Sequence, residues 1–330
     1  MSLPSLPVAI VGAGPTGIAC AVELGRRGID AVCFDKGSLL DSIYHFPEEM
    51  VWFSTRDLLD VAGVPFGTPH AHPTRLDTLA YYRSVAEKFA VRVEPDSEVA
   101  AARREADGSF TLPLRGREPG DFRASAVIVA TGFFSNPKKL DVPGCSLPLV
   151  HSRYVSGYPF HARRVVVVGG KNSAAEAALD LYRHGASVTM IVRAGGISER
   201  VKYWIKPDLE NRIRAGAVRA HFHSRVVEIR PDGVLAETPS GRTFLPADAV
   251  FALIGYEPDF ALLERCGVSL RGERREPEHD AETLETNVPG LYVAGAVLSG
   301  TDTGRIFIEN SRHHAAAIAD AIAQRRAVRA

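Results

Sequence analysis

The chain has 330 residues, with 39 lysines and arginines balanced by 39 aspartates and glutamates, so its formal charge at pH 7 is zero. This balance argues against a nucleic-acid or anionic-membrane partner, because both require clustered positive charge, and we expect neither. The length suggests about two domains. Because the sequence has neither a long apolar run nor a basic leader, we expect a cytoplasmic protein.

The N-terminal segment predicts a strand, a helix and a second strand. Residues 8–11 (VAIV) are apolar throughout, residues 12–17 (GAGPTG) are glycine-rich, and helical spacing then continues to Gly28, a typical helix-stopping residue. A second apolar run, residues 31–34, ends at Asp35. The G-x-G-x-x-G turn lets backbone and a helix N-terminus approach a pyrophosphate, and Asp35 can accept hydrogen bonds from ribose hydroxyls. The segment therefore predicts a dinucleotide-binding βαβ unit.

Four further elements are expected before the next glycine-rich turn. The pattern predicts a helix over 78–89, two short alternating strands over 98–103 and 109–114, and a buried strand over 126–132. The buried strand ends in ATG, a turn of small residues. We expect it to return to the sheet that the first βαβ unit began.

The second glycine-rich segment is a near-repeat of the first. Sliding the sequence by 157 residues aligns Gly12 with Gly169 and Gly28 with Gly185, with apolar runs on both sides. One pair of copies at so long an offset indicates two related domains rather than a solenoid. We therefore predict an α/β protein with two Rossmann-like, doubly wound domains, one for a flavin and one for a nicotinamide nucleotide.

The second copy differs from the first at the positions that select the nucleotide. Its turn reads GGKNSA over 169–174, and the residues that align with Asp35 and its successor are Val192 and Arg193. Without a carboxylate for a ribose 2′-hydroxyl, and with an arginine for a 2′-phosphate, this copy favours NADP(H) over NAD(H). Lys202 could assist at the phosphate, or it could simply lie exposed on a loop.

The C-terminal part is expected to complete the second domain and return to the first. The pattern predicts a helix over 208–215 and three strands over 225–230, 234–238 and 249–255. A charged run over 271–283 is expected to cross back to the first domain. A last strand over 290–295 and a long helix over about 304–323 follow. We accordingly predict that residues 1–155 and 281–330 form a discontinuous FAD-binding domain around an NADPH-binding domain of residues 156–280.

The cysteines and histidines show no metal-ligand spacing. Cys20, Cys33, Cys145 and Cys266 form no C-x-x-C pair, so we expect no metal and no internal dithiol, and each is expected to be an ordinary packed residue. Residues 313 and 314 are both histidine, which allows an acid–base role near a flavin. We expect instead that both lie on the surface of a helix.

Several segments resemble the two-domain flavoprotein disulfide reductases of the low-molecular-weight thioredoxin reductase type. GAGPTG, the ATG at 130–132, GGKNSA and TNVPGLYVAG at 286–295 are shared with that group. SIYHFP (42–47), VKYWIKP (201–207), FALIGYEPD and RIFIEN (305–310) are similar to the bacillithiol disulfide reductase family within it. The resemblance covers nearly the whole chain. It implies hydride transfer from NADPH to FAD, reduction of a low-molecular-weight thiol disulfide, and assembly as a homodimer or homotetramer.

The motifs and the resemblance together give the expected cofactor-binding residues. Those expected at FAD are Gly12, Gly14, Pro15, Gly17, Asp35, Lys36, Ser42, Tyr44, Val99, Thr131, Gly132, Gly295, Thr303 and Ile306. Those expected at NADPH are Gly169, Lys171, Asn172, Ser173, Ala174, Arg193, Lys202 and Gly255. Tyr44 and Phe53 are expected to flank the isoalloxazine ring, with core packing as the alternative. Ala296 stands where these flavoproteins commonly have Asp, so Asp302 or the segment 303–307 is expected to contact FAD instead.

One position departs from the family pattern. The bacillithiol disulfide reductases carry a cysteine in the first glycine-rich turn, where this chain has Thr16. A thiol at a helix N-terminus is an activated nucleophile, whereas a threonine hydroxyl has no such redox chemistry. Thr16 therefore marks the expected catalytic position and leaves the disulfide step open. Cys20 lies one helical turn further on the same face, and we expect it to be buried and inert.

Three other functions are compatible with the sequence. A cysteine-free NADPH reductase for ferredoxin or flavodoxin would keep the flavin and change the acceptor. A flavin monooxygenase is less favoured, because the F-x-G-x-x-x-H stretch that follows the ATG turn in those enzymes is incomplete here. A non-catalytic flavin or NADPH sensor would use the same two domains without turnover.

Overall fold

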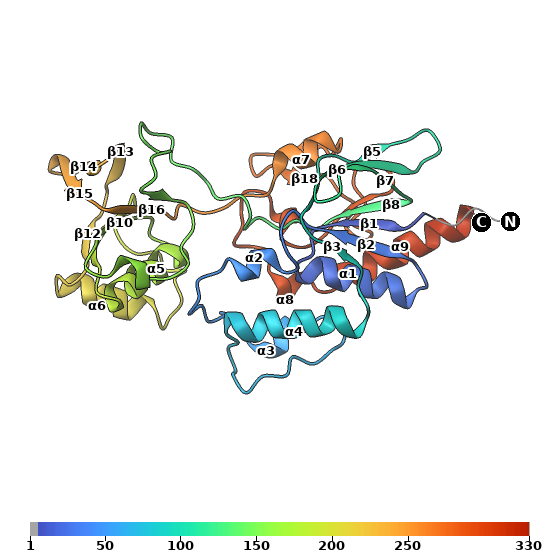
Figure 1. The fold of residues 1–330 in the computed structure, drawn as a ribbon, viewed down its shortest axis with the longest axis horizontal. Helices are drawn as coiled ribbons and strands as arrows, with labels where there is room; N and C mark the ends of the chain where they lie inside the picture. The colour runs from blue at the N-terminus through green and yellow to red at the C-terminus, as the bar shows by residue number, and fades with distance from the viewer. Residues whose placement is uncertain (1–5, 330) are drawn as a thin grey trace. The chain divides into compact units, whose positions relative to one another are not determined.

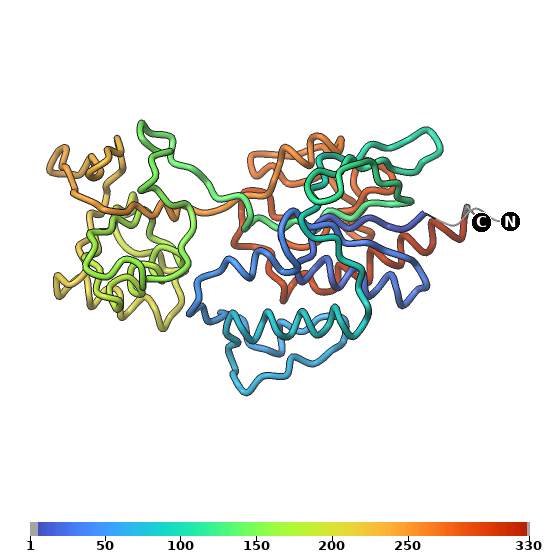
Figure 2. Tube along the Cα trace, in the orientation of Figure 1, coloured from blue at the N-terminus to red at the C-terminus, as the bar shows by residue number. Residues whose placement is uncertain are grey.

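The computed structural model of the protein describes residues 6–329 and divides into two units. Unit 1 combines the chain up to His45, Met50–Asn136 and the chain from Tyr256 onward; unit 2 combines the short segment Phe46–Glu49 with Pro137–Gly255. In Figure 2 the green and yellow part of the tube is mainly unit 2. The boundaries expected from the sequence, after 155 and after 280, both lie further along the chain.

A parallel sheet of five strands, in the order β19-β8-β1-β2-β3, forms the centre of unit 1. β1 (Val8–Val11) lies in the middle and is buried along its whole length. α1 (Pro15–Arg26) connects it to its neighbour β2 (Ala31–Phe34), while β8 (Ala126–Val129) pairs with its other side. The strand order therefore reverses between β1 and β8, and such a switch point is where doubly wound sheets bind ligands.

Helices and a second sheet cover the two faces of this parallel sheet (Figure 1). α1 packs beside the C-terminal helix α9 (His314–Arg329), and Arg27 and Asp320 form an ion pair of 2.8 Å between them. On the other face, the ring of Phe34 lies 4.8 Å from that of Phe122 in the antiparallel sheet. The other elements of unit 1 are α2 (Asp41–Tyr44), α3 (Arg56–Leu59), α4 (Arg75–Lys88), β3 (Val93–Glu94), β4 (Ser97–Val99), β5 (Arg103–Arg104), β6 (Phe110–Gly116), β7 (Gly120–Ala124), α7 (Phe260–Arg265), β17 (Leu270–Arg271), β18 (Glu276–Pro277), β19 (Leu291–Val293), the 3₁₀ helix η2 (Gly295–Ser299) and α8 (Ile308–Ser311).

Unit 2 repeats the plan, with a parallel sheet in the order β12-β11-β10-β16-β9. Its central strand β10 (Arg164–Val168) faces two hydrophobic cores: Val165 and Val167 face one core, and Val166 and Val168 face the other. The remaining elements are β9 (Val150–His151), the 3₁₀ helix η1 (Tyr158–Phe160), α5 (Asn172–Arg183), β11 (Ser187–Ile191), α6 (Lys206–Arg214), β12 (Arg219–His221), β13 (Arg225–Arg230), β14 (Gly233–Thr238), β15 (Gly241–Pro246) and β16 (Ala249–Ala252). Helices α5 and α6 pack on the first core, and the antiparallel sheet β13-β14-β15 packs on the second.

Both ends of unit 2 lie earlier in the sequence than expected. β9 pairs with β16 in register Val150 with Val250, so residues before 156 already belong to the second sheet. After Gly255, the hairpin of β17 and β18 belongs to unit 1, so the charged run from 271 is part of that unit. Within residues 6–329, none of the helices combines the length and apolarity needed to cross a membrane.

Candidate functional site

The first glycine-rich turn joins the end of β1 to α1 and lies against the end of β8. Gly12 has a φ of +111°, and a Cβ there would lie 2.6 Å from the carbonyl oxygen of Ala130. A Cβ on Gly17 would collide with the carbonyl oxygen of Gly12, whereas one on Gly14 would meet no atom within 4 Å. Gly12 and Gly17 are therefore required by the turn itself, and Gly14 leaves open space beside bare backbone. This cradle fits the pyrophosphate of a dinucleotide.

Asp35 lies at the end of β2 and is tied to the same turn. Its Oδ2 accepts a hydrogen bond of 2.8 Å from the amide of Ala13, and its Oδ1 accepts one of 3.0 Å from the amide of Gly37. Burial raises the pKa of this carboxyl above its ordinary value, while the two amide hydrogen bonds act in the opposite direction. Asp35 is thus fixed beside the turn, where a carboxylate can reach the ribose of a bound nucleotide.

Thr16 is the second residue of α1, and its side chain lies against the end of β19. A Cβ on Gly295, which has a φ of +74°, would come within 2.7 Å of Thr16 Oγ1. The amide of Gly295 donates a 3.1 Å hydrogen bond to Nδ1 of His314. The expectation that both histidines lie on a helix surface is wrong for His314, which is 7% exposed because α9 packs against other elements of unit 1; His313 is exposed.

Most of the other residues expected at FAD lie around this turn or on elements bonded to it. The amide of Leu40, just before α2, donates to the carbonyl of Ala13, which places Ser42 and Tyr44 near the turn. Val99 is buried on β4, which begins where Ser97 donates to the carbonyl of Asp35. The remaining members are exposed or half-buried and lie on turns, at the helix start or in the loop before α8: Pro15, Lys36, Thr131, Gly132, Thr303 and Ile306.

The aromatic residues expected near the isoalloxazine are accessible. The side chains of Tyr44 and Phe53 are 57% and 59% exposed, so the alternative that they are core residues is wrong. Arg75 donates a 2.6 Å hydrogen bond to the carbonyl oxygen of Tyr44, which holds α2 beside α4. Both side chains therefore lie on the surface of unit 1 and not in its core.

The second glycine-rich turn, in unit 2, is built in the same way as the first. Gly169 has a φ of +137°, and a Cβ there would lie 2.5 Å from the carbonyl oxygen of Leu253, at the end of the neighbouring strand. A Cβ on Gly170 would lie 2.6 Å from Val192 Cγ1. Lys171 comes next with a φ of −108°, which any residue can adopt, and its side chain is exposed. A lysine is therefore compatible with this turn, and its ammonium group is free to meet solvent or a phosphate.

The N-terminal turn of α5 is clamped to the segment that follows β11. Asn172 Oδ1 accepts a 2.9 Å hydrogen bond from the amide of Lys202, and its Nδ2 donates one of 3.0 Å to the carbonyl of Arg200. Lys202 Nζ lies 2.6 Å from Glu176 Oε1, and the residue is only 7% exposed. The alternative that Lys202 is an exposed loop residue is therefore wrong, because its charge is paired with Glu176. Sequence reasoning missed this clamp, although Asn172 and Glu176 are spaced one helical turn apart.

The other residues expected at NADPH surround the same turn. Arg193 is exposed and follows the end of β11, and Gly255, also exposed, follows β16. Ser173 is exposed on the first turn of α5, while Ala174 is buried beneath Gly169. The carboxyl ends of β10, β11 and β16 thus carry the expected residues at one edge of a parallel sheet.

All four cysteines are free, and three of them are buried. Burial raises the pKa of Cys20 to about 12 and that of Cys266 to about 11, and it raises the pKa of Cys33 further still. Thiols of this kind are poor nucleophiles at neutral pH. The expectation that Cys20 is buried and inert is confirmed.

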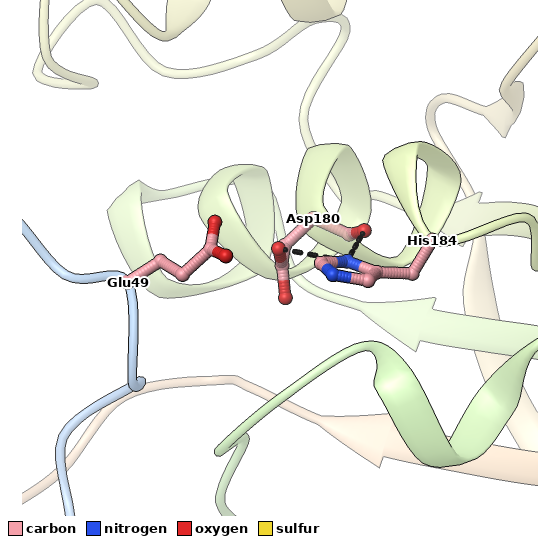
Figure 3. A group of neighbouring side chains, drawn as sticks. All are labelled: Glu49, Asp180 and His184. Carbon is pink, nitrogen blue, oxygen red and sulfur yellow. Dashed lines mark hydrogen bonds and ion pairs between the residues drawn. The ribbon is translucent and has the colours of Figure 1, made fainter.

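A separate group of polar side chains lies in unit 2 (Figure 3). Glu49, Asp180 and His184 each offer one potential metal-ligand atom, and these atoms lie within 4.8 Å of one another. Asp180 Oδ2 accepts hydrogen bonds from the hydroxyl of Tyr154 and, at 2.9 Å, from the amide of Gly157. His184 Nδ1 lies 2.9 Å from the carbonyl oxygen of Asp180. Asp180 is two turns, ~12 Å, along α5 from the glycine turn. We interpret this group as a structural connection between α5 and the segment around Tyr154.

Comparisons with known proteins agree with this architecture. Residues 9–295 match the family model described as pyridine nucleotide-disulphide oxidoreductase. The chain is 36% identical over 317 residues to bacilliredoxin reductase Bdr of Bacillus subtilis (strain 168), covering 96% of this chain and 97% of that protein.

Two solved structures are similar over their full lengths. Bacillithiol disulfide reductase Bdr from Staphylococcus aureus has a TM-score of 0.93 at 32% identity, covering 98% of this chain and 100% of the other. Bdr from Bacillus cereus has a TM-score of 0.93 at 35% identity, covering 97% and 99%. The expected fold class and the expected cofactors, FAD and NADPH, are confirmed. The chain therefore belongs to the pyridine nucleotide-disulphide oxidoreductase family and, within it, is an FAD- and NADPH-dependent oxidoreductase of the bacillithiol disulfide reductase group.

Proposed function

We propose that this enzyme oxidises NADPH and reduces the disulfide of a low-molecular-weight thiol, with bacillithiol disulfide as the representative substrate. The observation that carries the proposal is the pair of glycine turns at the two switch points, each closed by a strand-end carbonyl beside Gly12 or Gly169. The names of the relatives with full-length similarity supply the substrate class. In the net reaction NADPH gives up a hydride, which supplies two electrons and one proton, and solvent supplies a second proton. The S–S bond breaks, and the products are two thiols and NADP⁺.

We assign FAD to unit 1 and NADPH to unit 2. The turn at residues 12–17 with Asp35 would hold the pyrophosphate and a ribose of FAD, and the accessible rings of Tyr44 and Phe53 would lie near its isoalloxazine. The turn at 169–174 would hold NADPH, with Arg193 at the 2′-phosphate. FAD bound in unit 1 would supply the two-electron chemistry that links NADPH to the acceptor.

We further propose that the chain forms no disulfide of its own during turnover. Thr16 offers a hydroxyl where the resemblance to the family predicts a thiol, and Cys20, Cys33 and Cys266 are buried with raised pKa values. The acceptor disulfide would then be reduced directly at the flavin site. An accessible surface beside Thr16, rather than a protein dithiol, would receive it.

An acceptor comparison tests this function. The purified holoenzyme is reduced with NADPH without oxygen and then mixed with bacillithiol disulfide, ferredoxin, flavodoxin or dioxygen, while the visible flavin absorbance is followed. We expect the disulfide to reoxidise the flavin fastest and to give two thiols for each NADPH. Faster reoxidation by ferredoxin, flavodoxin or dioxygen would overturn the assigned acceptor, and a flavin that NADPH does not bleach would overturn the enzyme as a whole.

Arg193→Ala tests the nucleotide preference. Arg193 lies just after the end of β11. A charge-assisted hydrogen bond from its guanidinium to a phosphate contributes about 1.5–3 kcal/mol. We therefore expect the variant to bind NADPH about 10- to 100-fold more weakly and NADH almost as well as the wild type. Isothermal titration with both nucleotides measures this. Arg230→Ala, which removes a surface ion pair with Glu228 in the same unit, is the matched control and should change neither. Equal losses for the two nucleotides would contradict the role.

We also propose a cytoplasmic location, a homodimer or homotetramer, and no nucleic-acid or membrane partner. Four free cysteines fit a reducing compartment, and the zero net charge gives no basic attraction to nucleic acid or lipid. Light scattering after size-exclusion chromatography measures the assembly, and a monomer at micromolar concentration would contradict it.

A further inference from the structure

His314 is buried, whereas its neighbour His313 is exposed. The two rings follow one another at the start of α9, with centroids 4.6 Å apart. His314 Nδ1 accepts a 3.1 Å hydrogen bond from the amide of Gly295. Because an accepting nitrogen carries no proton, the neutral ring holds its proton on Nε2.

Gly295 needs an acceptor of this kind. Its amide is buried at the point where the chain leaves β19, and its φ of +74° turns the backbone sharply into η2. On its other side Gly295 approaches Thr16 so closely that a Cβ would lie 2.7 Å from the threonine Oγ1. Its backbone is therefore held between Thr16 on α1 and His314 on α9. A buried amide without a partner would be strongly disfavoured, so this turn depends on the imidazole.

We infer that His314 is a positioning residue of the flavin site, which holds the Gly295 turn against Thr16 through the Nδ1 hydrogen bond. This inference rests on the proposed placement of FAD in unit 1. His314 acts through Gly295, one of the residues expected to contact FAD. The same bond keeps the strand end of β19 beside the glycine turn of β1.

The environment of His314 keeps it able to accept this bond. Burial lowers the pKa of the imidazole to about 4, and the nearby His313 and His279 act in the same direction. The ring is therefore neutral at physiological pH, and only a neutral ring has a lone pair for the Gly295 amide.

Two substitutions at 314 and one at 313 separate positioning from general packing. His314→Asn keeps an acceptor near the position of Nδ1, His314→Leu fills the space without an acceptor, and His313→Leu is the matched control. Hydrogen exchange of the apoprotein, read on peptides that cover 291–299, reports the Gly295 amide. Flavin fluorescence then measures the Kd for FAD.

We expect His314→Leu to speed exchange in this peptide and to weaken FAD binding about tenfold. His314→Asn should stay within about threefold of the wild type on both measurements, and the control His313→Leu should match the wild type. Unchanged exchange in His314→Leu would overturn the inference, as would equal losses in the Leu and Asn variants, since these would indicate loss of packing. If His314→Leu does not fold, the Asn and His313→Leu variants still decide, because a weak-binding Asn variant contradicts the role of the acceptor.

The exchange measurement keeps this inference separate from the proposed function. Faster exchange in the apoprotein together with failure of every disulfide acceptor would overturn the substrate and leave the His314 contact supported. Fast exchange without any change in the Kd for FAD would show a structural contact only, and would overturn the positioning role.

Discussion

Thr16 decides what chemistry the first turn can carry. It is the second residue of α1, where backbone amides are unpaired by the helix, and its side chain contacts the Gly295 turn. A thiolate at such a position is stabilised by those amides and by the helix dipole. Threonine has no redox chemistry at this position, whereas a cysteine in its place would be activated for it.

Replacing Thr16 by Cys should create a reactive thiol. We expect a pKa below the ordinary value of about 8.5, measured as the pH dependence of iodoacetamide alkylation in a Cys145→Ser background that leaves only the three buried native thiols. Thr303→Cys, in a loop without helix amides, is the control and should titrate near the ordinary value. A Thr16→Cys pKa at or above that of the control would contradict this account of the turn.

His314 should make stability fall in mild acid. Burial, with His313 and His279 nearby, lowers its pKa to about 4, whereas the unfolded chain has a value near 6.5. Between these values the unfolded state binds a proton that the folded state does not, so this contribution is fully present above about pH 6.5 and is lost as pH falls towards 4. We expect a loss of about 3 kcal/mol in the free energy of unfolding, measured by urea unfolding of the apoprotein. The His314→Asn variant should lack this component, and an identical pH profile would contradict it.

At the scale of elements, the clamp between α5 and the segment at 200–202 contains a buried charge. Lys202 is 7% exposed and its partner Glu176 has a side chain that is 18% exposed. Removing one partner of a buried ion pair is usually strongly destabilising, whereas replacing both partners by apolar residues is often neutral. The hydrogen bonds of Asn172 to the same segment should keep the backbone in place in either case.

Glu176→Gln should lower the free energy of unfolding by about 2–4 kcal/mol, and the double variant Glu176→Leu with Lys202→Met should recover most of it. Urea unfolding gives both values. Glu199→Gln is the control: it removes one of the two carboxylates that pair with Lys206, but the side chain of Glu199 is 89% exposed, so we expect a change of less than about 0.5 kcal/mol. A single variant as stable as its control would mean that the Lys202 ammonium has another adequate partner.

The elements that sequence predicts best are those with a simple period. Both βαβ units follow from apolar runs that flank a glycine turn, and Arg225–Arg230 is found as a strand with the expected bounds. α4 begins at Arg75, not 78, because Thr74 and Asp77 form a capping box, which the T-x-x-D spacing in the sequence indicates. The expected long C-terminal helix is two helices, α8 and α9, because a turn at 312–313 interrupts it just before the buried His314.

The candidate site shows the same limit. The glycine turns follow from local pattern, but the pairing of Lys202 with Glu176 and the burial of His314 depend on contacts between residues distant in sequence. Periodicity assigns a face to a side chain only when its neighbours are known. Two adjacent histidines are equivalent in the sequence, and only the packing of α9 distinguishes them.

At the scale of the whole molecule, each unit has its own sheet and core. Residues 137–255 are contiguous and contain both hydrophobic cores of unit 2, while α7, which follows them, buries Phe260, Leu262 and Leu263 in unit 1. In unit 1 the carbonyl oxygen of Asn136 accepts a 3.1 Å hydrogen bond from the amide of Glu257, so the two ends left by removing residues 137–255 lie side by side. Both units should therefore fold when separated at these positions.

We expect a fragment of residues 137–255 to be monomeric, to unfold cooperatively and to bind NADP⁺ without FAD. A fragment of residues 156–280, cut where composition alone suggests, should aggregate, because it loses β9 from the edge of the sheet and exposes the apolar face of α7. Unit 1 closed by a short glycine–serine linker between Asn136 and Tyr256 should bind FAD, and NADPH should not bleach it. Circular dichroism, light scattering and nucleotide titration distinguish these outcomes. NADP⁺ binding by the closed unit 1, or a 156–280 fragment as well folded as 137–255, would contradict the assignment of one nucleotide to each unit and the boundaries on which it depends.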